Sequence, residues 1–72
     1  MIDDYKKASG DVWKFFKKYF DGDGSDEYWR EVIDKSNDIA EMYKDTELHY
    51  YVSKYLVLCV GVLNERQRNK AL

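Results

Sequence analysis

The sequence predicts an all-α fold: a three-helix bundle whose helices run up, down and up over residues 3–20, 26–44 and 46–69. Three observations lead to this prediction. Apolar residues recur every three or four positions in three segments, which is the period of an amphipathic helix. Glycine, aspartate and threonine separate the segments, and the chain contains no proline. With 72 residues it has room for only one core, so 1–72 is expected to be a single helical domain.

The first predicted helix, residues 3–20, carries one apolar stripe. The members of this stripe and their apolar neighbours are Tyr5, Val12, Phe16 and Tyr19, with Ala8, Trp13 and Phe20 beside them. Gly10 lies within the pattern and costs about 1 kcal/mol relative to alanine in a helix interior. Because Asp11 is a suitable N-terminal cap, the helix could begin either before or after Gly10.

The second predicted helix, residues 26–44, follows a turn at residues 21–25 that is rich in glycine and aspartate. The spacing of its apolar residues alternates between four and three, which makes it the most regular amphipathic segment of the chain. Its buried face is expected to contain Trp29, Ile33, Ser36, Ala40 and Tyr43, flanked by Val32, Ile39 and Met42.

The third predicted helix, residues 46–69, begins after Asp45 and Thr46, both of which are suitable caps. The run 55–63 is rich in β-branched residues, but a single strand would have no partner and the helical period continues on both sides. Nine residues are also too few to cross a bilayer, so no membrane contact is expected. The central stripe is predicted to contain Leu48, Val52, Tyr55, Cys59 and Val62.

Charge is distributed unevenly, although the net charge is only −2. Residues 1–20 carry five bases and three acids (+2), residues 21–47 three bases and ten acids (−7), and residues 48–72 four bases and one acid (+3). The acidic middle disfavours nucleic-acid binding, because such binding needs a clustered basic face. A DNA-associated regulatory module is the alternative if the basic helix ends converge, through Lys14, Lys17, Lys18, Arg66, Arg68 and Lys70.

No catalytic or metal-binding constellation is found, and no cofactor is expected. The segment 21–26 has oxygen ligands at alternating positions, but Asp26 stands where a calcium loop needs glycine and Val32 where it needs glutamate. His49 is the single histidine, and Cys59 lies on an apolar stripe, as a small buried hydrophobe would. The chain is therefore predicted not to be an enzyme, and its lone cysteine and N-terminal sequence favour the cytoplasm.

Carboxylates of the second helix form the first candidate contact surface, which we call the acidic ridge. They recur every three or four residues over about 27 Å, opposite the apolar stripe. They are Glu27, Glu31, Asp34, Asp38, Glu41 and Asp45. One interpretation is a solvated face that keeps an aromatic-rich protein in solution. The other is a surface that binds a basic groove on a partner protein through complementary charge.

The second candidate surface lies on the third helix, whose apolar residues cover an arc of about 200°, more than two neighbouring helices require. A row on its back consists of Tyr50, Lys54, Val57 and Gly61, and its small and flat members would let another helix approach closely. This predicts a homodimer, or docking to a partner protein, through the third helix. The alternative is a helix enclosed by the other two. Tyr50 and Tyr51 are the tyrosines expected at the surface.

The aromatic strings Trp13–Tyr19, Tyr28–Trp29 and Tyr55–Leu58, with the glycine and aspartate turn and Val32–Asp34, resemble short uncharacterised helical proteins of phages and mobile elements in Gram-positive gut bacteria. The resemblance covers most of the chain and contains no catalytic motif. It implies a small accessory protein in the host cytoplasm, such as an inhibitor of a host protein. The leading expectation is thus a protein-interaction module, with the DNA-associated module and a structural homo-oligomeric subunit as alternatives.

Overall fold

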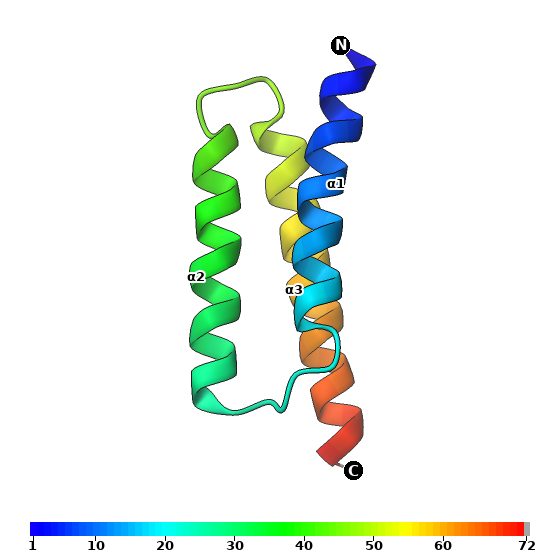
Figure 1. The fold of residues 1–72 in the computed structure, drawn as a ribbon, viewed down its shortest axis with the longest axis vertical. Helices are drawn as coiled ribbons and strands as arrows, with labels where there is room; N and C mark the ends of the chain where they lie inside the picture. The colour runs from blue at the N-terminus through cyan, green and yellow to red at the C-terminus, as the bar shows by residue number, and fades with distance from the viewer. Residues whose placement is uncertain (72) are drawn as a thin grey trace.

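The computed structural model describes residues 1–71, which form three α-helices in the predicted order (Figure 1). α1 spans Ile2–Tyr19, α2 spans Asp26–Tyr43 and α3 spans His49–Ala71. α1 and α3 run in one direction and α2 in the other, and each helix packs against the other two. The bundle is long and narrow, measuring 43 × 18 × 16 Å. The prediction of an all-α, up-down-up three-helix bundle is confirmed.

α1 begins before Gly10 and continues through it, which settles the position of its N-terminus. Acidic residues in its first turn and lysines in its last turn have the signs that favour the two ends of a helix dipole. The place that a Cβ atom would take at Gly10 has no neighbouring atom within 4 Å. Gly10 is therefore not required by packing, and its only effect on α1 is the conformational cost of a glycine.

The turn between α1 and α2 uses each of its small residues for a different purpose. Gly24 has a φ angle of 71°, in the left-handed region that favours glycine. Ser25 caps α2, because its hydroxyl accepts a hydrogen bond from the backbone N–H of Tyr28 at 3.1 Å. Gly22 lies against the ring of Tyr28, and a Cβ atom at this position would overlap that ring. The turn thus places Tyr28 at the entrance of α2, directly over the end of α1.

α3 begins at His49, three residues later than predicted. The hydroxyl of Thr46 donates to the carbonyl of Tyr43 at 2.7 Å and accepts from the N–H of Leu48 at 3.1 Å. The Thr46 hydroxyl therefore makes hydrogen bonds to backbone groups within the turn. It is not the N-terminal cap of α3. The first turn of α3 follows, with the N–H of Val52 bonded to the carbonyl of Leu48 at 2.9 Å.

The core lies along the axis of the bundle and is built from all three helices. Its buried members are Ala8, Val12, Phe15 and Tyr19 from α1, Tyr28, Val32 and Tyr43 from α2, and Leu48, Val52, Leu56, Cys59 and Leu63 from α3 and the turn before it. Among the described residues, none with a charged side chain is buried. The fold is thus held together by apolar packing, supplemented by tyrosine.

Val12, Tyr19 and Tyr43 are buried as predicted, but the buried faces of α1 and α2 are rotated by a fraction of a turn from the predicted stripes. In α1, Phe15 is buried, whereas Trp13, which was expected in the core, is 50% exposed. In α2, Tyr28 and Val32 are buried, whereas Ile33 is 47% exposed. Each helix faces two neighbours at once, and the direction between those neighbours decides which side is buried. The apolar period of a single helix does not predict where its two neighbours lie, so it does not predict this rotation.

α3 is rotated in the opposite direction in its second half. Leu56 and Leu63 are buried, whereas Tyr55 and Val62, which were assigned to the stripe, are only partly covered. Leu48, Val52 and Cys59 are buried as predicted. The helix is continuous from residue 49 to 71, so the rejection of a strand over residues 55–63 is confirmed.

Three core tyrosines bury their rings while their hydroxyls reach acceptors at the margin of the bundle. Tyr28 donates to the carbonyl of Tyr19 at 2.6 Å, and Tyr19 donates to a carboxylate oxygen of Glu31 at 3.1 Å. Tyr43 donates to a carboxylate oxygen of Asp11 at 2.6 Å. Burial, together with the bonded carboxylate of Glu31, raises the pKa of Tyr19 to about 12. The hydrogen bond to Asp11, together with burial, raises the pKa of Tyr43 to about 12.

These pKa values predict that the fold loses stability in alkali. Between pH 10 and 12 the unfolded chain releases the Tyr43 proton and the native chain retains it, so the free energy of unfolding falls as pH rises, by up to about 1.4 kcal/mol per pH unit. Tyr43→Phe removes this contribution and should give a shallower decline, measured by urea unfolding at several pH values. Equal slopes for the two proteins would contradict the assignment.

Gly10 has open space around it and Gly22 is in contact with a ring, so alanine substitutions at the two positions can be compared. Gly10→Ala should stabilise the fold by about 0.5–1 kcal/mol, because its site is open and helical. Gly22→Ala should destabilise it by about 1–3 kcal/mol, because the new methyl group displaces the ring of Tyr28. Thermal unfolding followed by circular dichroism measures both. A stabilising Gly22→Ala would contradict the described packing of the turn.

Candidate protein-binding surface

The outer face of α3 stays apolar and exposed after the helix has packed against α1 and α2. Tyr50 is 73% exposed, Val57 70% and Leu58 65%. Gly61 is exposed as well, and the place of its missing Cβ atom has no neighbour within 4 Å. Lys54 lies between them, with its ammonium group 5.5 Å from the centre of the Tyr50 ring. The prediction that Tyr50, Lys54, Val57 and Gly61 lie at the surface is confirmed.

This exposure follows from the composition of α3. Residues 55–63 are apolar or glycine without interruption, and at 100° per residue such a run reaches every side of a helix. Burying Leu56, Cys59 and Leu63 toward the bundle axis leaves Val57 and Leu58 on the opposite side. α1 and α2 pack on the buried side of α3 and leave most of the surface of Val57 and Leu58 uncovered.

A shallow hollow extends the apolar surface from α3 onto α2. It has a volume of about 320 Å³ and is lined by Ile33, Ser36, Asn37, Ala40, Ser53, Leu56, Val57 and Val60. Ile33, at 47% exposure, stands at its edge beside Val57. Ile33 was predicted to lie on the buried face of the second helix, and Leu58 was not predicted as a site residue. The uninterrupted apolar run was the signal for Leu58, whereas the position of Ile33 depends on how α2 is rotated in the bundle.

The acidic ridge is shorter than predicted. Asp45 lies in the turn after α2, which ends at Tyr43, so it does not continue the ridge along the helix. Glu31 accepts a hydrogen bond from Tyr19, and Glu41 forms an ion pair with Lys44 at 2.9 Å. The remaining members are exposed side chains of α2 at positions 27, 34 and 38.

Lysines of α1 lie next to the acidic ridge. One hollow between α1 and α2 is lined by Asp38 together with Lys14, Lys18 and Lys35, around the side chain of Ile39. The negative charge of the ridge therefore has positive charge beside it, and the surface as a whole is mixed. This arrangement weakens the attraction that the ridge alone would exert on a basic partner.

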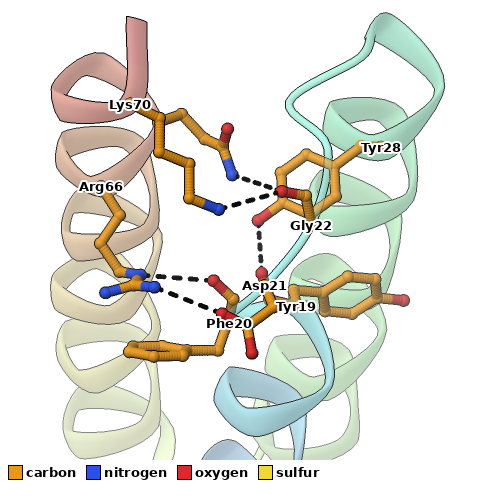
Figure 2. A network of polar contacts seen from close by, with 8 residues as sticks. Tyr19, Phe20, Asp21, Gly22, Tyr28, Arg66 and Lys70 are labelled. Atoms are coloured by element: carbon orange, nitrogen blue, oxygen red, sulfur yellow. Dashed lines mark hydrogen bonds and ion pairs between the residues drawn. The ribbon is translucent and has the colours of Figure 1, made fainter. Parts of the chain in front are cut away.

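The end of α3 lies beside the end of α1 and the turn after it, and basic side chains of α3 are engaged there within the chain (Figure 2). Lys14 and Lys18 of α1 instead line the hollow between α1 and α2. The guanidinium group of Arg66 lies 3.5 Å from the centre of the Phe20 ring, and its Nε donates to the carbonyl of Phe20 at 3.3 Å. Gln67 and Lys70 donate to the carbonyl of Gly22 at 2.9 and 3.4 Å. These side chains hold the end of α1 and the following turn, and this lowers their availability to phosphates.

The chemically reactive side chains do not form a site. Cys59 is buried, as predicted, and burial raises the pKa of its thiol, which disfavours the thiolate. Within residues 1–71, no three histidine, cysteine, aspartate or glutamate side chains gather as a metal site would require. No helix in the described part of the chain is long and apolar enough to cross a membrane.

No protein-family model, curated protein or solved structure matches this chain. The resemblance to small helical proteins of phages and mobile elements therefore stays a prediction. The surfaces of the molecule are therefore the evidence for its function. On the outer face of α3, the exposed apolar side chains, the open space at Gly61 and the sequence pattern all indicate a binding surface.

The burial of Cys59 can be tested by its reaction with a thiol reagent such as dithiobis-nitrobenzoate. Labelling of the native protein should be slower than labelling of the urea-unfolded chain by on the order of 100-fold or more, because it requires opening of the bundle. Labelling at the unfolded rate under native conditions would mean that Cys59 is accessible, which contradicts the packing of α3.

Proposed function

We propose that this chain is a non-enzymatic protein-interaction module whose contact surface is the outer face of α3. The observation that carries the proposal is the exposure of Val57 and Leu58, at 70% and 65%, with Ile33 beside Val57 at 47%. Contiguous exposed apolar side chains mark interaction sites on small proteins. Covering such a side chain contributes about 1.5–3 kcal/mol, so a partner covering all three would gain several kcal/mol.

The outer face lies on a helix that is packed against the rest of the chain near both of its ends. α3 is a continuous helix of 23 residues, supported near its start by Tyr51, which packs against Tyr5, and near its end by Arg66, which packs on Phe20. The apolar residues in between are therefore presented on an ordered scaffold. Binding to such a surface costs little ordering of the backbone, which favours affinity.

The acidic ridge gives weaker support for binding. Exposed helix faces are normally charged, and the lysines of α1 beside the ridge reduce its field. A basic partner and an inhibitory role toward a host protein rest on the ridge and on the sequence resemblance. The proposal that the outer face of α3 binds a partner depends neither on the ridge nor on the resemblance.

Site-specific photo-crosslinking tests the proposal. A benzophenone amino acid in place of Val57 should give covalent protein adducts in an extract of the producing cells, with a second copy or with another protein. The matched control carries the same amino acid in place of Glu27, an exposed position in the first turn of α2, and should give few adducts. Absence of adducts from position 57, or equal yields from both positions, would contradict the proposal.

A further inference from the structure

We infer that the partner on the outer face of α3 is a second copy of this chain, docked with its α3 antiparallel to the first. The inference rests on the proposed function and adds the identity and orientation of the partner. It comes from the order of charged, large and small side chains along the face.

Four residues form a seam along the outside of α3. Lys54, Leu58, Gly61 and Glu65 are spaced four, three and four residues apart, which is the spacing of a helix-to-helix contact. All four are exposed. A cation stands at one end of the seam and a carboxylate at the other, with an apolar residue and a glycine between them.

The charges of the seam distinguish between two orientations of a second copy. In a parallel pair, Lys54 would face Lys54 of the second copy and Glu65 would face Glu65, so both contacts would repel. In an antiparallel pair with the two-fold axis between residues 58 and 61, Lys54 faces Glu65 of the second copy, and by symmetry this attraction occurs twice. The antiparallel orientation also opposes the dipoles of the two helices.

The same orientation matches the shapes of the central residues. Leu58 then faces Gly61 of the second copy, where the missing side chain leaves open space around the backbone. A shift by one repeat toward the start of α3 would instead set Lys54 against Leu58, which leaves the charge of Lys54 without its partner. Charge and shape therefore select the same register.

The charged residues of the seam are free to make these contacts. Lys54 lies over the exposed ring of Tyr50 at 5.5 Å, and Glu65 accepts from Arg68 at 3.5 Å between side chains that are 61% and 71% exposed. An ion pair as exposed as this one contributes little to stability. Replacing it with a contact across an interface therefore costs little free energy. The covered surface would include Leu58, one of the apolar side chains that carry the proposed function.

Charge reversal tests the inference on the purified protein by sedimentation equilibrium. The parent chain should form dimers, and Lys54→Glu and Glu65→Lys should each raise the dissociation constant about tenfold, since each creates two repulsions. The double variant should restore the parent value. An equimolar mixture of the two single variants should form heterodimers, because every pair is then attractive. Glu27→Lys on α2 is the control and should leave the dissociation constant unchanged.

The outcomes separate this inference from the proposed function. A parent chain that stays monomeric up to about 1 mM overturns the inference, and adducts from position 57 with a different protein would still support the interaction module. A dimer that the single variants do not weaken, or that the double variant does not restore, overturns the antiparallel register. Monomers together with no adducts from position 57 overturn both.

Discussion

The fold depends on one constraint: α3 has more apolar surface than the two helices packed against it can bury. α1 and α2 contain 18 residues each, whereas α3 contains 23 and is apolar on nearly every side over residues 55–63. The two shorter helices pack on one side and bury Leu56, Cys59 and Leu63. The opposite side is left uncovered, and it is the origin of the surface to which we assign the function.

Tyrosine allows a chain of this size to fill its core with large rings. The rings of Tyr19, Tyr28 and Tyr43 are buried, and each hydroxyl reaches an acceptor at the margin of the bundle. Among the described residues, no buried side-chain nitrogen or oxygen atom lacks a hydrogen-bond partner. The hydroxyl of Tyr43 also ties the C-terminal end of α2 to the middle of α1. Burial of these rings therefore adds apolar area without leaving a polar group unpaired.

The sequence was sufficient to predict the helices and the row on the back of α3, because both depend on periodicity within one segment. It was insufficient to predict which residues are buried where this depends on the position of a neighbouring helix. The choice of Phe15 over Phe16 for the core, and the exposure of Ile33, are set by the rotation of each helix toward two partners. The start of α3 was misplaced because Thr46 can cap a helix or close a turn with the same hydroxyl.

The turn after α1 is fastened by residues that are far away along the chain. Arg66 and Gln67 donate to the carbonyls of Phe20 and Gly22 across 46 and 45 positions, and Lys70 donates to Gly22 across 48. Because the ribosome synthesises proteins from the N-terminus, α1, the turn and α2 are all made before these donors exist. The hairpin of α1 and α2 therefore emerges with only the contacts of its own turn, such as the bond from Tyr28 to Tyr19, and the contacts from α3 are added last.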